Sequence, residues 1–140
     1  CTLTMMLDLS LASNEMKIIP PDIKHLSGLT KLKINENVLN QLPEEIGQLT
    51  KLLSIDISEN ELQYLPAEIG NWVEIIKFSA YSNQLRELPM TIGNWVNVTE
   101  MELQDNALKS LPRSIGQMVK VRKIDASDNE MTILPDEIFD

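Results

Sequence analysis

The chain has 140 residues, of which 43% are hydrophobic, and it carries a formal net charge of −9. The apolar content excludes a disordered chain, and the length allows one domain with one core. The negative charge argues against nucleic acid and against an anionic membrane surface as partners, and no apolar run is long enough to span a membrane.

A period of 23 residues runs through the whole sequence. Asparagine recurs at this interval, at Asn14, Asn37, Asn60, Asn83, Asn106 and Asn129. Proline recurs at the same interval, at Pro20, Pro43, Pro66, Pro89, Pro112 and Pro135. Such self-similarity predicts a solenoid, with residues 1–140 as a single domain of about six repeats. Because Leu3 already stands one period before Leu26, we expect a fragment without end caps.

Each repeat begins with a short strand in which apolar and polar residues alternate, so that one face is buried and the other is open. The expected strands are Asp8–Leu11, Lys31–Ile34, Ser54–Ile57, Lys77–Ala80, Glu100–Leu103 and Lys123–Ala126. Because equivalent strands are one period apart, we expect them to stack in parallel and to form a curved sheet.

A turn around the asparagine follows each strand, and a proline-led segment then returns the chain along the outer side. In Leu42–Leu49 the proline stands where the first turn of a helix tolerates it, and two acidic residues follow. We expect one or two helical turns, of the α or 3₁₀ type, which Gly47 and the equivalent glycines at 70, 93 and 116 end or loosen. The predicted fold class is therefore α/β, with strands on the concave face and short helices or 3₁₀ turns on the convex face.

The asparagines and the aliphatic positions are interpreted as structural, because a buried amide in such a turn satisfies backbone groups of its own and the adjacent repeat. Ala80 and Ala126 replace larger aliphatic residues. Phe78 can fill the space beside Ala80, whereas Ala126 has no evident compensation. Trp72 and Trp95 occupy an equivalent position on the outer side, where we expect core residues; the alternative is an exposed aromatic patch.

The search for a catalytic site finds no suitable constellation. His25 is the only histidine, and nothing in the pattern places it beside Cys1 or a buried serine. No Cys and His spacing fits zinc, and no glycine-rich phosphate loop is present. We therefore predict that the chain is not an enzyme and has no catalytic residue, cofactor or metal site.

The open face of the strands is the predicted binding surface. Its side chains form columns, with lysines frequent in the first columns and acidic residues in the last, so that we expect a banded face. Strands at the usual spacing span about 24 Å over six repeats, which is enough for a small domain. The predicted partner-binding residues are Lys33, Asp56, Glu59, Lys77, Ser79, Tyr81, Glu100, Glu102, Gln104, Asp105, Asp125 and Asp128.

Two features of this face stand out. Glu102, Asp105, Asp125 and Asp128 form a predicted acidic cluster across two repeats, and Tyr81 is the aromatic residue at the middle of the columns. We predict that the acidic columns steer a basic partner surface and that Tyr81 anchors it. A calcium site at the acidic cluster is an alternative, although the cluster lacks the loop geometry and glycine of a dedicated calcium loop.

The full repeat reads L-x-x-L-x-L-x-x-N-x-L-x-x-L-P-x-x-I-G-x-L, and Leu39–Leu49 carries it well. It resembles the intracellular 23-residue class of leucine-rich repeats, found in Ras-group scaffolds of the Shoc type, in Scribble-type polarity proteins and in Roco-type GTPase-kinases. The resemblance covers the whole chain and implies a leucine-rich repeat solenoid. Extracellular relatives resemble one another in disulfide-stapled caps, and the single Cys1 offers none, which favours a cytoplasmic location.

The resemblance implies a protein-protein interaction module of an intracellular signalling scaffold, which binds a partner through its concave face. It implies a small GTPase or a phosphatase as the partner, and another domain with a basic surface also fits the charge. The alternative is a regulatory or substrate-recruiting repeat region of a larger multidomain enzyme, such as a Roco-type GTPase-kinase. We also expect that uncapped ends allow self-association, because open strand edges pair readily.

Overall fold

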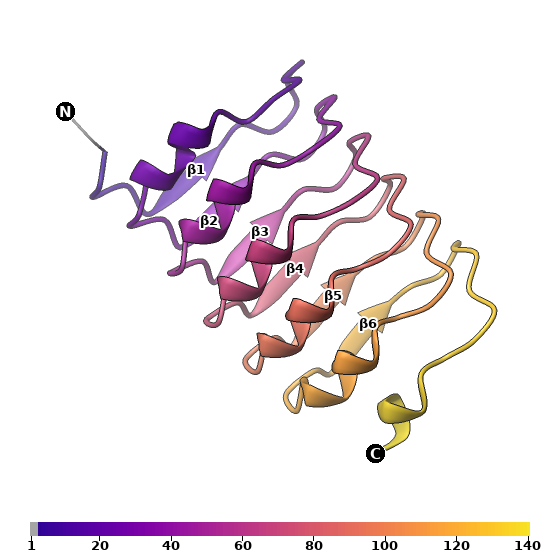
Figure 1. Ribbon diagram of the computed structural model, residues 1–140. Helices are drawn as coiled ribbons and strands as arrows, with labels where there is room; N and C mark the ends of the chain where they lie inside the picture. The colour runs from indigo at the N-terminus through magenta and orange to yellow at the C-terminus, as the bar shows by residue number, and fades with distance from the viewer. Residues whose placement is uncertain (1–2) are drawn as a thin grey trace.

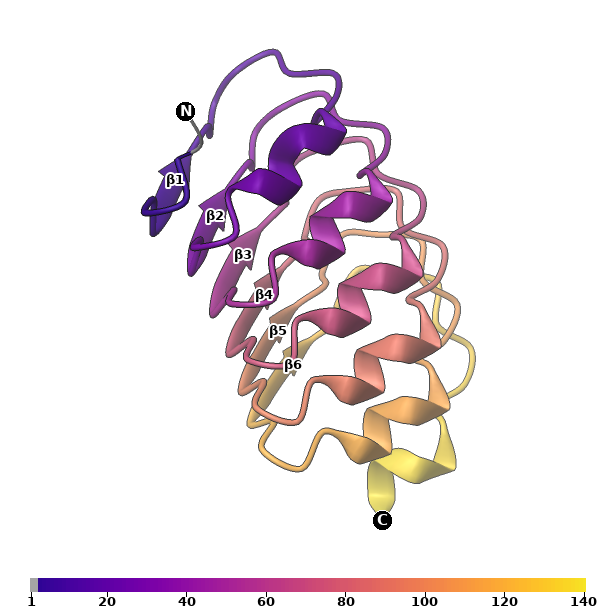
Figure 2. The ribbon, with the colours of Figure 1, turned by 60° about the vertical axis from the view of Figure 1, so that its left-hand side comes forward.

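The computed structural model describes residues 3–140, so that Cys1 lies outside the described residues. Over that range, short strands and short helices alternate along the chain. The strands are β1 (Asp8–Ser10), β2 (Lys31–Lys33), β3 (Ser54–Asp56), β4 (Lys77–Ser79), β5 (Glu100–Glu102) and β6 (Lys123–Asp125). The helices are η1 (Pro21–His25), η2 (Glu44–Gln48), η3 (Ala67–Asn71), η4 (Met90–Asn94), η5 (Arg113–Gln117) and η6 (Asp136–Phe139). Strands line one side of the solenoid and helices the other (Figures 1 and 2).

The strands form one parallel sheet in chain order, from β1 to β6. Paired residues are one 23-residue period apart, as in Asp8 with Lys31, so the predicted parallel stack is confirmed. Each strand is one residue shorter than predicted, yet the N–H of Leu11 still donates to the carbonyl oxygen of Lys33 at 2.8 Å. The regular ladder therefore ends earlier, while the hydrogen bonding between repeats continues into the turn.

The convex layer consists of 3₁₀-helices that begin directly after the repeated prolines, as in η2 after Pro43. None of the helices in residues 3–140 is long and apolar enough to cross a membrane. The prediction that glycine ends these helices is wrong, because Gly47 lies inside η2 and has no positive φ. A Cβ atom on Gly47 would lie 2.5 Å from the carbonyl oxygen of Glu68 in the next repeat. The glycine is needed because adjacent helices approach each other this closely.

The hydrophobic core lies between the two layers and includes both tryptophans, as predicted. Trp72 and Trp95 are fully buried, and their rings stack with centroids 6.1 Å apart. Phe78 packs against Trp95 with the ring centroids 4.9 Å apart. Ala80 is also fully buried, so the ring of Phe78 and the small Ala80 share the core of one repeat. Ala126, on the last strand, is only half-buried.

The asparagine ladder joins each repeat to the preceding one. The side-chain amide of Asn60 donates to the carbonyl oxygens of Ile57 and Ser58 in its own repeat, and to that of Ile34 in the preceding repeat. Its Oδ1 accepts the N–H of Leu39 at 3.0 Å. The predicted structural role of the asparagines is confirmed, and the bonds that cross repeats fix the register of the strands on which the concave face depends.

Candidate protein-binding face

The predicted partner-binding residues lie at the strand and turn positions that alternate with the core. All of them are at least partly exposed except Ser79, which is 2% exposed. The hydroxyl of Ser79 donates to Oε2 of Glu102 at 2.5 Å. Ser79 therefore positions the carboxylate of Glu102 and has little surface of its own to offer a partner.

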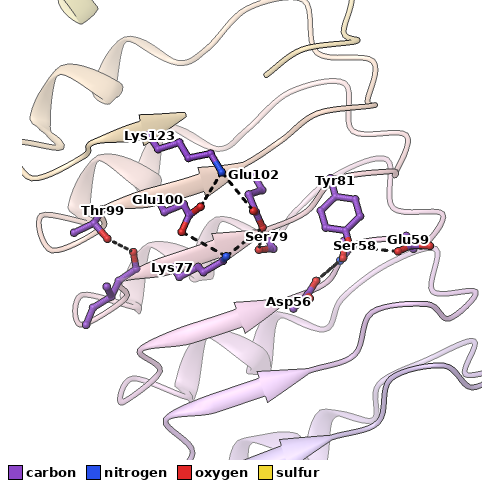
Figure 3. Close-up of polar contacts among 11 residues, drawn as sticks. Asp56, Ser58, Glu59, Lys77, Ser79, Tyr81, Thr99, Glu100, Glu102 and Lys123 are labelled. Carbon is purple, nitrogen blue, oxygen red and sulfur yellow. Dashed lines mark hydrogen bonds and ion pairs between the residues drawn. The ribbon is translucent and has the colours of Figure 1, made fainter. Parts of the chain in front are cut away.

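Two lysines and two glutamates join β4, β5 and β6 in one ion-pair network (Figure 3). Nζ of Lys77 lies 3.4 Å from Oε2 of Glu100 and 3.5 Å from Oε2 of Glu102. Nζ of Lys123 lies 2.9 Å from Oε1 of Glu100 and 3.8 Å from Oε1 of Glu102. The expected separation into basic and acidic bands is therefore wrong for these strands, since opposite charges neutralise each other there.

This network shifts the pKa of both members of its shortest contact. The hydrogen bond from Lys123 is the main cause that lowers the pKa of Glu100, and the same bond raises the pKa of Lys123. Glu100 adds stability above its unfolded pKa of about 4.3, which is lost as the pH falls through its lower folded pKa. Lys123 adds stability below its unfolded pKa of about 10.4, which is lost as the pH rises through its higher folded pKa.

Lys123→Met is expected to raise the pKa of Glu100 toward its ordinary value, because the main cause of its lowering is removed. An NMR titration that follows the side-chain carboxyl carbon of Glu100 measures this shift. Lys120→Met is the matched control, because Nζ of Lys120 donates to Oδ1 of Asn97 and not to Glu100. An unchanged pKa of Glu100 in Lys123→Met would contradict the network.

Three members of the predicted acidic cluster, Glu102, Asp105 and Asp125, have separate local partners. Glu102 belongs to the ion-pair network, and Oδ2 of Asp105 accepts the hydroxyl of Ser82 at 2.9 Å. Oδ1 of Asp125 accepts the hydroxyl of Ser127 at 2.6 Å, and this bond is the main cause that lowers the pKa of Asp125. In residues 3–140, no group of three or more His, Cys, Asp or Glu side chains is placed to hold a metal ion. The calcium alternative therefore receives no support.

The last acidic column coincides with a backbone feature that the sequence analysis missed. Its members have φ angles between 51° and 57°: Ser13, Glu36, Glu59, Ser82, Asp105 and Asp128. This left-handed conformation costs an L-residue about 1–2 kcal/mol, and Asn and Asp tolerate it better than Glu does. The repeated turn imposes the conformation on every member, so it is a property of the fold and not of one binding site.

Glu59→Asn is expected to raise the free energy of unfolding by up to about 1 kcal/mol, because asparagine tolerates the left-handed conformation at this position. Chemical denaturation followed by circular dichroism measures the change. Glu61→Asn removes the same charge at an exposed neighbour with no positive φ, and no comparable gain is expected there. Equal effects of the two substitutions would point to charge and not to backbone conformation.

A hollow of about 410 Å³ lies on the concave face over β2 to β5. It is lined by Lys31, Lys33, Ser54, Asp56, Lys77, Ser79, Tyr81 and Glu102. The hydroxyl of Tyr81 donates to Oε1 of Glu59 at 3.3 Å, and Oδ1 of Asp56 accepts the hydroxyl of Ser58 at 2.5 Å (Figure 3). From the predicted set the hollow gathers six residues, Lys33, Asp56, Lys77, Ser79, Tyr81 and Glu102. Its lining does not include Asp105, Asp125 or Asp128.

Two residues of this hollow were absent from the predicted set. Lys31 and Ser54 are the first residues of β2 and β3 and belong to the column of first strand residues on the open face. Both line the hollow with their partly exposed side chains. The register alone could have found them, since Lys31 pairs with Ser54 and Ser54 pairs with Lys77. The predicted set favoured the acidic columns and therefore omitted this part of the face.

No family model matches the chain, and no curated protein matches it either. Solved structures do match. A leucine-rich repeat protein of Leptospira interrogans is 28% identical with a TM-score of 0.77, over 97% of this chain and 41% of that chain. YopM from Yersinia enterocolitica is 27% identical with a TM-score of 0.74, over 97% of this chain and 28% of that chain.

The leucine-rich repeat ectodomain of the Arabidopsis thaliana receptor kinase GASSHO1/SCHENGEN3 is similar too. It is 26% identical with a TM-score of 0.87, over 99% of this chain and 17% of that chain. This chain therefore spans less than half the length of these three structures. The matches agree with the register of the sheet and the asparagine ladder, and the fold is a leucine-rich repeat solenoid with its parallel strands on the concave side.

Proposed function

We propose that this leucine-rich repeat solenoid is a protein-interaction module of an intracellular signalling scaffold, and that it binds its partner through the concave face. The observation that carries the proposal is the hollow over β2 to β5, where lysines, two carboxylates and Tyr81 converge on an exposed sheet. Solenoids offer extended concave surfaces of this kind to protein partners. The similar GASSHO1/SCHENGEN3 ectodomain was solved in complex with CASPARIAN STRIP INTEGRITY FACTOR 2, which supports a protein or peptide partner.

The repeat pattern supports the Ras-group, Shoc-type class and a cytoplasmic location, with a small GTPase or a phosphatase as the partner. The charge of −9 fits a partner surface that is basic on balance. On this proposal Tyr81 is the anchor, and the other predicted partner-binding residues, apart from the buried Ser79, form the surrounding surface. Aromatic side chains of this kind are frequent among the residues that contribute most to binding.

A pull-down from cytoplasmic extract, read by mass spectrometry, tests the proposal. The wild-type chain is compared with Tyr81→Ala combined with Asp56→Asn, and with a control on the convex side, Gln48→Ala combined with Asn94→Ala. The proposal expects a protein that the wild type and the convex control retain and the concave variant loses. Loss from the convex control alone, or no difference among the three baits, contradicts concave-face binding. Circular dichroism verifies that the variants fold.

A second candidate function is a regulatory or substrate-recruiting region of a larger enzyme. The similar GASSHO1/SCHENGEN3 ectodomain belongs to a receptor kinase, and this chain covers 17% of that structure, which favours the idea of a repeat region inside a longer protein. Sequencing the locus on both sides of these residues decides between the two candidates. A kinase or GTPase domain in the same reading frame supports the enzyme, and its absence supports the scaffold.

Self-association through the ends of the solenoid is a separate proposal about the isolated chain. The open edges of β1 and β6 carry backbone groups that can pair with another copy. Sedimentation velocity at increasing concentration tests it. A sedimentation coefficient that rises with concentration supports pairing, and a constant monomer value contradicts it.

A further inference from the structure

The first column of the concave face alternates in charge, with one interruption. In the order of the strands it reads Asp8, Lys31, Ser54, Lys77, Glu100 and Lys123, as the pairing register places them. Acidic and basic residues alternate at every step except at Ser54, where an acidic residue would continue the series. Ser54 is uncharged and partly exposed, and it lies between two lysines on the neighbouring strands.

Elsewhere in the same column, an acidic residue does stand between two lysines. Glu100 also lies between two lysines on the neighbouring strands, and its carboxylate binds both of them. Its Oε1 lies 2.9 Å from Nζ of Lys123, and its Oε2 lies 3.4 Å from Nζ of Lys77. The two lysines that flank Ser54 are separated by the same two strand spacings, about 10 Å. A carboxylate above Ser54 would therefore meet Lys31 and Lys77 as Glu100 meets Lys77 and Lys123.

The charges around Ser54 leave capacity for one more anion. Lys33 forms no ion pair within residues 3–140. Lys31 has a single long contact with Asp8, at 3.8 Å. Lys77 already pairs with two carboxylates, but its ammonium group has three N–H donors and can bind a third. Two carboxylates also line the hollow, and each already accepts a serine hydroxyl, from Ser58 at Asp56 and from Ser79 at Glu102.

We propose that a carboxylate side chain of the protein partner binds above Ser54, between Lys31 and Lys77 and beside Lys33. The inference rests on the proposed function, because the occupant is part of the protein that docks on the concave face. It also refines that function. A partner that is basic on balance presents one acidic side chain at this point of the face, and this requirement gives specificity that overall charge does not provide.

The site itself is tested by supplying the carboxylate from the chain. Ser54→Glu is compared with Ser54→Gln, because the glutamine side chain has nearly the same shape as glutamate and carries no charge. Added negative charge should destabilise a chain of net charge −9 unless a cationic site receives it. We expect the melting temperature of Ser54→Glu to exceed that of Ser54→Gln by about 2 °C or more at low salt, and the difference to vanish in 1 M NaCl. An equal or lower melting temperature for Ser54→Glu overturns the site.

The docking step is tested with the partner obtained in the pull-down. Ser54→Glu places a fixed carboxylate where the partner's own must bind, so its affinity should fall at least about tenfold relative to Ser54→Gln. Equal affinities of the two variants overturn the proposed docking mode while the proposed function stands. If no partner is found, the proposed function fails, and the melting temperatures still decide whether the site accepts a carboxylate.

Discussion

Trp95→Ala is expected to lower the free energy of unfolding by about 3–5 kcal/mol, as large-to-small changes of buried aromatic residues do. Trp95 is fully buried and packs against Trp72 on one side and Phe78 on the other. Its Nε1 also donates to the carbonyl oxygen of Ile69 at 2.9 Å. The substitution removes all three contacts and leaves a cavity between adjacent repeats, because the stacked layers cannot collapse to fill it.

Urea denaturation followed by circular dichroism measures this effect. Val96→Ala is the matched control, because the neighbouring Val96 is 45% exposed and its loss should change the free energy by less than about 0.5 kcal/mol. A small effect of Trp95→Ala would mean that the tryptophan pair is not part of the core. Such a result would favour the alternative left open by the sequence, an exposed aromatic patch.

Asn60→Ala is expected to cost about 1–3 kcal/mol, because a buried polar group left without a partner costs this much. The substitution leaves the N–H of Leu39 without the side chain that binds it, while the carbonyl oxygen of Ile34 loses one of its two amide donors and keeps that of Asn37. Both groups belong to the preceding repeat. The loss is therefore expected at the contact between two repeats, and amide hydrogen exchange near Leu39 should accelerate.

Asn14→Ala provides the matched control for this prediction. Asn14 is exposed, and within residues 3–140 its side-chain amide donates only to the carbonyl oxygens of Leu11 and Ala12 in its own repeat. Its removal should cost no more than about 1 kcal/mol. Equal costs for Asn14→Ala and Asn60→Ala would contradict the conclusion that the bonds between repeats carry the effect.

The repeat period predicted most of the fold, because each period supplies the same apolar positions, asparagine and proline. The parallel register, the short helical turns after the prolines and the burial of Trp72 all followed from that regularity, although the sequence left open whether the turns were α or 3₁₀. The role of Gly47 did not, because close contact between helices of adjacent repeats depends on their distance and not on local sequence. The left-handed turn at Glu59 was also missed, since glutamate is not a residue that signals a positive φ.

The candidate site was predicted less completely than the fold. The columns correctly placed Tyr81 and Lys33 on the open face, because position in a strand follows from the period. They did not predict which charges would neutralise each other. Nζ of Lys77 reaches two carboxylates of β5, and that choice depends on side-chain conformations that a sequence pattern does not specify.

Photo-crosslinking tests whether the concave face is the docking surface. A photoreactive phenylalanine derivative replaces Tyr81 in one bait and the exposed Asn71 of η3, on the convex side, in another. Both baits are irradiated in cytoplasmic extract, and crosslinked proteins are identified by mass spectrometry. Binding through the concave face predicts a crosslinked protein from position 81 and none from position 71. A protein crosslinked from position 71 and not from position 81 would place the docking surface on the convex side and contradict concave-face binding.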